Sequence, residues 1–276
     1  MNVASLSPIR RNEMNTALEA AQAAGIRIAQ LFGQIVAVNQ KTVDGQSNGL
    51  VTQADLDAED IILALIRENF PGHTILSEES LADGDVSATN LWVVDPLDGT
   101  NNFAHGIPHF SVSIAYLEKG RVTCGVVHNP LTKDWYIAGA GEGAWFNGSR
   151  VSVSKHSLIT ETVAGFGFYY DRGKMMQATL NAIGELFRKQ IVGVRRFGSA
   201  ALDLAYVGVG RFGGYFEYEL SPWDFAAGKL FVEEAGGKVT DCQGQALSVA
   251  KSSVLATNSR LHSEFLDVVS RPYLRT

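Results

Sequence analysis

One segment constrains the fold of this 276-residue chain more than any other: residues 91–103, LWVVDPLDGTNNF. Its apolar beginning is typical of a buried strand. The apolar run ends at Asp95 and Asp98, two carboxylates three positions apart, and Gly99 and Thr100 follow at once. Carboxylate oxygens are hard ligands that suit Mg²⁺ better than zinc or copper. The segment therefore predicts a buried strand that presents a site for a hard cation at its end.

A simpler interpretation of the two aspartates stays open. Asp95 or Asp98 could cap the helix that is expected to begin near Gly99. However, Pro96 fixes the bend between the two carboxylates, and carboxylates held this close repel each other unless cations neutralise them. Both interpretations predict a helix N-terminus just after the pair, where free amides can receive phosphate oxygens.

The overall composition limits the classes of protein that remain. The chain is 46% apolar and 19% charged, as in ordinary globular proteins, and its net charge of −6 argues against nucleic acid as the main partner. Two cysteines, Cys124 and Cys242, are too few for a disulfide framework and suggest a reducing compartment. No signal peptide is evident, and no apolar run is long enough to span a bilayer. We expect a cytoplasmic protein without a membrane segment.

Hydrophobic periodicity predicts helices and strands that are interleaved in layers. Helices are expected at residues 16–32, 55–70, 175–188, 200–209, 224–235 and 261–269. Strands are expected at 75–76, 111–116, 122–127, 135–138, 151–153, 194–197, 214–219, 239–240 and 254–256, with a loop or hairpin at 38–49. The expected fold class is α+β or mixed α/β, with an N-terminal α+β half at 1–153 and a C-terminal α/β half at 154–276.

Several of these motifs together resemble the signatures of a known family. Residues 95–100, DPLDGT, with NF at 102–103 and HGIP at 105–108, resemble the D-P-[IL]-D-G-T signature of the inositol monophosphatase family. A second family signature, W-D-x-A-A-G, is matched at 223–228, and E-A-G-G is matched at 234–237. The resemblance covers nearly the whole chain. It implies the layered α-β-α-β-α sandwich of the sugar phosphatases and usually a homodimer.

The resemblance also implies a set of metal ligands. Glu78 matches the first glutamate of the family's E-E pair, which bridges a metal and the attacking water. Asp95 matches the aspartate that the first two metals share, and Leu97 matches a ligand that uses its backbone carbonyl. Asp98 and Asp224 match ligands of the second metal. The implied cofactor is Mg²⁺, with two ions expected and a third left open.

Asp55 has two interpretations. The pattern Thr52-x-x-Asp55 at a helix start resembles a capping box, with Asp in place of Glu. In the family, the aspartate of the L-V-T-x-x-D motif, matched at residues 50–55, helps to hold a third and weaker metal. Lys41 would match a lysine upstream of that motif, although the loop between them is longer here than in the common pattern.

The residues expected to perform the chemistry lie beside these ligands. Thr100 matches the residue that orients and activates the nucleophilic water together with Glu78, and Asp95 completes the expected catalytic set. The backbone amides of Gly99 and Thr100 match phosphate contacts. Ser77 stands where many relatives have glycine, and we see no reason for this change to abolish binding.

The expected substrate contacts lie mainly in the C-terminal half. Ala200 matches a residue that offers its backbone amide, and Glu217 matches a residue that accepts a hydrogen bond from a substrate hydroxyl. Asp98 and Asp224 are also expected to contact the substrate. From the residues alone, Gly198-Ser199 could be a plain helix N-cap.

The resemblance implies Mg²⁺-dependent hydrolysis of a small polyol phosphate monoester by metal-activated water, with myo-inositol 1-phosphate as the first candidate and lithium as an inhibitor. Related enzymes act on fructose 1,6-bisphosphate, 3′-phosphoadenosine 5′-phosphate, histidinol phosphate or NADP. A regulatory role is the alternative from another class, because some bacterial relatives associate with the transcription machinery. That role calls for a basic surface, and the sequence offers only Arg195-Arg196. No nucleic acid or membrane partner is expected.

Overall fold

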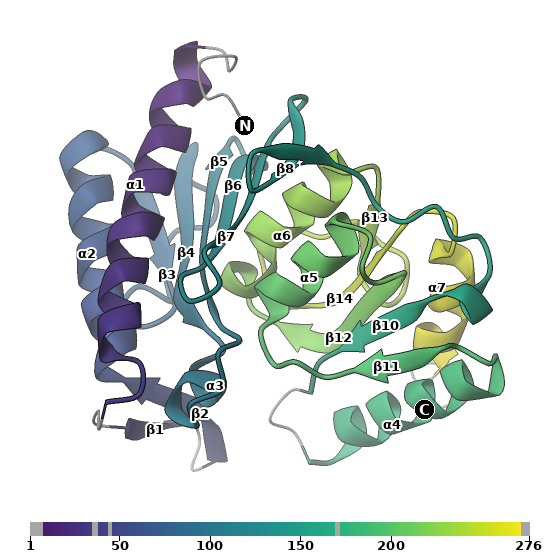
Figure 1. Ribbon diagram of the computed structural model, residues 1–276. Helices are drawn as coiled ribbons and strands as arrows, with labels where there is room; N and C mark the ends of the chain where they lie inside the picture. Colours follow the sequence, from purple (N-terminus) through teal and green to yellow (C-terminus); the bar gives the residue numbers. More distant parts are fainter. Residues whose placement is uncertain (1–7, 35–37, 44–45, 169–171, 272–276) are drawn as a thin grey trace.

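The computed structural model describes residues 8–34, 38–43, 46–168 and 172–271. The described chain forms two large β-sheets and a two-stranded one, with one helical layer between the large sheets and a further helical layer on each outer side (Figure 1). This arrangement confirms the predicted mixed α/β class and the layered α-β-α-β-α sandwich.

The larger sheet has seven strands in the order β3-β4-β5-β6-β7-β8-β9. Their bounds are β3 (Thr74–Ser77), β4 (Asn90–Asp98), β5 (Ser111–Glu118), β6 (Arg121–Asn129), β7 (Asp134–Gly139), β8 (Gly143–Phe146) and β9 (Ser149–Val151). Strands β3 and β4 pair in parallel, and the rest form the expected antiparallel meander. Sequence reasoning missed β8, and it correctly placed a hairpin turn at Asn147-Gly148, where both residues have positive φ, 47° and 81°.

The smaller sheet has five strands in the order β11-β10-β12-β14-β13. Their bounds are β10 (Val163–Phe166), β11 (Gly193–Arg195), β12 (Gly214–Leu220), β13 (Lys238–Thr240) and β14 (Ser252–Thr257). Strand β10 runs parallel to both of its neighbours, and the strands on the other side of β12 are antiparallel. The sequence did not predict β10, because a four-residue segment with an internal glycine has too little pattern to register.

The helices form the three remaining layers. Helices α1 (Pro8–Leu31) and α2 (Gln53–Asn69) cover the outer face of the seven-stranded sheet, and α5 (Ala200–Gly208) and α6 (Pro222–Glu234) fill the space between the sheets (Figure 1). Helices α4 (Lys174–Arg188) and α7 (His262–Ser270) cover the other face of the smaller sheet. The short α3 (Thr100–Ala104) follows β4, and β1 (Val38–Val43) and β2 (Gln46–Thr52) form a hairpin before α2. Within the described residues, no helix combines the length and apolarity needed to cross a membrane.

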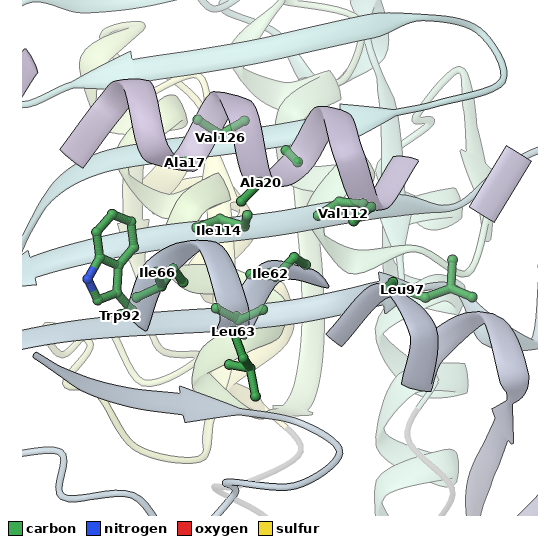
Figure 2. Packing of buried hydrophobic residues seen from close by; sticks show 14 of the residues in the cluster. Ala17, Ala20, Ile62, Leu63, Ile66, Trp92, Leu97, Val112, Ile114 and Val126 are labelled. Atoms are coloured by element: carbon green, nitrogen blue, oxygen red, sulfur yellow. The ribbon is translucent and has the colours of Figure 1, made fainter. Parts of the chain in front are cut away.

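The two faces of β4 contact different layers. Trp92 and Val94 pack in the core beneath α1 and α2, where Ile62 of α2 lies beside this strand (Figure 2). Leu91 and Val93 pack in the opposite core with α5 and α6. Because side chains alternate along a strand, Asp95 is directed toward the layer that contains α6.

Helix α6 packs unusually close to the seven-stranded sheet. A Cβ atom at Gly125 of β6 would lie 3.0 Å from the carbonyl oxygen of Ala227 and 3.2 Å from its Cα, so a larger residue there would crowd the backbone of α6. Nearby, the hydroxyl of Ser113 in β5 donates to the carbonyl oxygen of Trp223 at 3.2 Å. These contacts hold the first turn of α6, which carries Asp224, against β5 and β6.

Candidate active site

A pocket of about 450 Å³ lies where β4 ends, between the larger sheet and the smaller one. Its walls come from the turn after β3, the end of β4 and the start of α3, and from α5, β12 and the start of α6. The predicted site residues that line it are Glu78, Asp95, Leu97, Asp98, Gly99, Thr100, Ala200, Glu217 and Asp224.

Three carboxylates converge on one wall of this pocket. Glu78, Asp95 and Asp224 each place one oxygen so that all three oxygens lie within 4.8 Å of one another. The parallel pairing of β3 with β4 sets Ser77 beside Val94, and the amide of Glu78 donates to the Val94 carbonyl at 3.3 Å. This register brings Glu78 next to Asp95, and α6 supplies Asp224 from the other side.

The position of Asp224 depends on the start of α6. Asp224 and Ser221 form a capping box, in which the Asp224 carboxylate accepts from the Ser221 amide at 2.7 Å. Burial raises the pKa of Asp224 well above its ordinary value, and the charges of Glu78 and Asp98 raise it further. Several carboxylates held together in this way match the hard-oxygen donor set of Mg²⁺, whose charge would offset their repulsion.

Asp98 makes a different set of contacts. One of its oxygens accepts from the amide of Ala200 at 3.2 Å, and the other accepts from the amide of Ala201 at 2.9 Å and from the hydroxyl of Ser199. Asp98 thus satisfies the free amides at the N-terminus of α5. Burial raises its pKa to about 6. The Asp98 carboxylate and the Ala200 amide contact each other directly, and their roles toward metal and substrate stay predictions.

The simpler capping interpretation of the two aspartates is wrong for α3. The N-cap of α3 is Gly99, and no side chain caps it. Asp95 accepts from the amide of Leu97 at 3.0 Å instead, and Asp98 caps α5. Gly99 has a φ of 98°, and a Cβ atom there would lie 3.1 Å from the carbonyl oxygen of His109, so glycine is required at this turn.

Asp55 caps α2 and also contacts the predicted catalytic threonine. One of its oxygens accepts from the Thr52 amide at 2.8 Å and from the Thr52 hydroxyl at 2.6 Å, which confirms the capping box. Its other oxygen accepts from the Thr100 hydroxyl at 2.8 Å. The Thr100 hydroxyl also lies 3.1 Å from the carbonyl oxygen of Leu97. Burial raises the pKa of Asp55 to about 6, and a role in a third metal site stays a prediction.

The pocket also contains a second group of polar side chains, which come from α5 and β12. Glu217 is buried and accepts from the Tyr215 hydroxyl at 2.7 Å, and burial raises its pKa to about 7. Asp203 of α5 is also buried, and its Oδ1 atom has no hydrogen-bond partner in the described residues. Arg196 lies close enough to lower the pKa of both acids.

Sequence reasoning missed two of these residues and could not place a third. Asp203 and Tyr215 were not singled out, and the only signal for Asp203 is a single charged residue in the otherwise apolar α5 sequence AALDLAYVG. Lys41 was predicted as an upstream partner of Asp55. Its backbone lies in β1, and its side chain is outside the described residues.

The layered fold and the acidic pocket define a class: an α/β sandwich whose central pocket can hold divalent cations. Comparison with known families narrows this class, because the model of the inositol monophosphatase family matches residues 10–271. The chain belongs to the inositol monophosphatase family.

The proteins that are similar to this chain carry two kinds of name, Nus factor and IMPase. Nus factor SuhB of Escherichia coli K12 is 41% identical over 245 residues, which cover 86% of this chain and 90% of that protein. The IMPase of Thermotoga maritima is 34% identical with a TM-score of 0.86, and the match covers 95% of this chain and 98% of that one.

A further relative, SaIMPase-II, is known with two ligands. In its structure with bound inositol monophosphate, the sequence is 30% identical to this chain and the TM-score is 0.79. The match covers 95% of this chain and 96% of that one. Its structure with bound 2′-AMP is 31% identical with the same TM-score, and the match covers 94% of each chain.

Proposed function

We propose that this protein is a Mg²⁺-dependent phosphatase that hydrolyses small phosphorylated polyols, with myo-inositol 1-phosphate as the first candidate substrate. One observation carries the proposal: the oxygens of Glu78, Asp95 and Asp224 converge within 4.8 Å on the wall of a pocket large enough for such a substrate. Membership in the inositol monophosphatase family supports the same activity.

Bound Mg²⁺ would supply positive charge to the phosphate ester and lower the pKa of a water molecule. The chain's own residues would position the reactants. The Thr100 hydroxyl has one hydrogen, and donating it to Asp55 leaves the oxygen lone pairs of Thr100 free to accept from water. Glu78 also lines the pocket and can accept a second hydrogen from that water. Thr100 and Glu78 would then orient the attacking water, as the resemblance implies.

The second group of polar side chains in the pocket would recognise the alcohol part of the substrate. Glu217 and Asp203 are hydrogen-bond acceptors, and the hydroxyl of Tyr215 contacts Glu217. Such a group suits an alcohol that carries several hydroxyls. The ligands bound to SaIMPase-II, inositol monophosphate and 2′-AMP, are both phosphate monoesters, so several alcohols of this kind deserve comparison.

The test is phosphate release by the purified protein with and without Mg²⁺, over a panel of esters that includes myo-inositol 1-phosphate, 2′-AMP, histidinol phosphate, fructose 1,6-bisphosphate, 3′-phosphoadenosine 5′-phosphate and NADP. We expect Mg²⁺-dependent release that is fastest with the inositol ester. Asp95→Asn and Asp98→Asn should each abolish it. Activity that survives either substitution would refute the proposed metal site.

A second candidate function is a regulatory role in transcription. It is favoured by the 41% identity to Nus factor SuhB of Escherichia coli, and it revises the expectation that nucleic-acid machinery plays no part. The two functions can coexist, because a binding surface need not use the pocket. Pull-down of the tagged protein from a cell extract tests this role, and recovery of neither RNA polymerase nor RNA would count against it.

Further features belong to the same proposal. By family resemblance we propose two Mg²⁺ ions with a third near Asp55, inhibition by lithium, and a homodimer. We also propose two halves, residues 1–153 and 154–276, since the larger sheet ends at Val151 and the smaller one begins at Val163. A cytoplasmic location is proposed because Cys124 and Cys242 are both buried and form no disulfide with each other.

A further inference from the structure

The buried face of α2 carries two acidic residues one helical turn apart. Asp55 and Glu59 are separated by four positions, which places them on the same side of the helix. They are 1% and 3% exposed, although acidic side chains on helices usually face solvent. Asp55 contacts Thr100 at the start of α3. Glu59 reaches a different segment, the turn that follows β3.

Glu59 accepts hydrogen bonds from residues on both sides of Glu78. One carboxylate oxygen, Oε1, accepts from the amide of Glu79 at 3.1 Å and from the amide of Ser80 at 3.2 Å. The same oxygen accepts from the hydroxyl of Ser77. Three donors from residues 77–80 therefore meet at one atom of α2, and Glu78 lies in the middle of this turn.

The structure leads us to propose that Glu59 is a positioning residue, which holds the turn 77–80 so that the Glu78 carboxylate meets Asp95 and Asp224. This inference rests on the proposed function, since it assigns a task to a residue behind the proposed metal site. Glu59 lines no part of the pocket and would act only through the turn.

The physical basis is the strength of these particular hydrogen bonds. Bonds to an ionised carboxylate are shorter and roughly twice as strong as neutral ones. The hydrogen bonds from the Glu79 and Ser80 amides are part-buried, and losing their acceptor costs free energy, so the turn would rearrange rather than keep its shape without Glu59. Glu78 is half-buried and lies within this turn, where its own amide donates to the Val94 carbonyl at 3.3 Å. The hydrogen bonds to Glu59 add fixed points on both sides of Glu78.

One of the three donors is a side chain. The hydroxyl of Ser77 donates to Glu59, and a glycine at this position would remove that donor. The two amide donors remain with either residue. We therefore expect the Ser77 hydroxyl to contribute little to the position of the turn, and the two amide bonds to Glu59 to contribute most.

The alternative is that Glu59 only stabilises the fold. A measurement of metal affinity distinguishes this structural role from a positioning role. Groups behind metal ligands typically change affinity by about 10- to 100-fold when they are mutated. Ile62 lies three positions further along α2, is fully buried in the apolar core, and has no polar side-chain atom that could bond to the turn 77–80. Ile62→Ala is the control for lost stability, and Asp60→Ala is the control for an exposed change on the same helix.

The experiment measures Mn²⁺ binding by electron paramagnetic resonance, which reports free Mn²⁺ directly, together with Mg²⁺-dependent phosphate release. We expect Glu59→Ala to weaken Mn²⁺ binding by about tenfold or more, by analogy with other groups behind metal ligands. Glu59→Gln keeps an acceptor oxygen and should lose distinctly less Mn²⁺ affinity than Glu59→Ala. Ser77→Gly should change affinity by only about twofold, because it removes one donor of three. At saturating Mg²⁺, the KM for substrate should be nearly unchanged in all of them.

The proposal is overturned if Glu59→Ala binds Mn²⁺ as tightly as Ile62→Ala does. If Glu59→Ala does not fold, Glu59→Asp takes its place, because it keeps the charge and withdraws the acceptor oxygen by one methylene. Unchanged Mn²⁺ affinity in that variant would overturn the proposal equally. If the wild-type protein releases no phosphate, the proposed function fails, and the Mn²⁺ titration still decides the role of Glu59.

Discussion

Replacing Glu217 by glutamine should make the protein more stable at high pH. Burial raises the pKa of Glu217 from 4.5 to about 7, although its hydrogen bond from Tyr215 and the charge of Arg196 partly oppose this effect. Between these two pH values the folded state keeps a proton that the unfolded chain has lost. The free energy of unfolding therefore falls as the pH rises through this range. The contribution is fully present below pH 4.5 and is lost above about pH 7.

The size of this effect follows from the two pKa values. Each pKa unit corresponds to about 1.4 kcal/mol, so the wild-type protein should lose about 3 kcal/mol of stability between pH 4.5 and pH 8 through Glu217. Glutamine is neutral at every pH and still offers an oxygen to Tyr215. Glu217→Gln should then match the wild type near pH 4.5 and exceed it by up to about 3 kcal/mol at pH 8.

Urea unfolding followed by tryptophan fluorescence, in the presence of a chelator, measures this difference at each pH. Glu219→Gln is the matched control on the same strand, because Glu219 forms a partly exposed ion pair with Lys251 at 2.8 Å. That control should shift stability by no more than about 1 kcal/mol. The reasoning is refuted if Glu217→Gln and the wild type differ by a constant amount between pH 5 and pH 8.

Three further predictions concern the site and its supports. Thr100→Val should lower kcat by about a hundredfold with little change in KM, since it removes the hydroxyl that donates to Asp55. Thr100→Ser keeps the hydroxyl and should retain most of the activity. Steady-state kinetics on both variants checks this. Gly125→Val should lower the free energy of unfolding in urea by about 1–3 kcal/mol, because it forces α6 and Asp224 away from β6. The same shift should weaken Mg²⁺ binding. A variant that binds Mg²⁺ normally would contradict this. Added Mg²⁺ should raise Tm more at pH 8 than at pH 5, because protons compete for carboxylates such as Asp98, whose pKa is about 6; equal shifts in thermal unfolding at both pH values would contradict this.

Local sequence patterns were sufficient for most of the fold. The apolar stripe of α2 and the Pro71-Gly72 pair after it predicted a helix at 55–70, and the helix spans Gln53–Asn69. Periodicity is informative here because α2 buries one continuous face against the sheet. The prediction failed where the pattern was short, as at β8 and β10. It also placed the start of the first helix at residue 16, whereas α1 begins at Pro8.

The site was predicted less evenly than the fold. The aspartates of β4 stood out because two charges directly after an apolar run need an explanation. Asp203 and Glu59 did not stand out, since an acidic residue within a helix usually lies in solvent. Only the packing of α5 and α2 against other elements shows that these two side chains are buried.

By itself, the sequence determined that β4 ends in two carboxylates and that a helix begins just beyond them. These properties depend on neighbouring residues alone, so local chemistry decides them. The tertiary structure decided which carboxylates meet. Glu78 reaches Asp95 through the parallel register of β3 and β4, and Asp224 arrives because α6 packs closely on β6. It also separated the two aspartates, since the free amides of α5 bind Asp98 while Asp95 faces the other acids. Such contacts between distant segments depend on packing, and no local pattern specifies them.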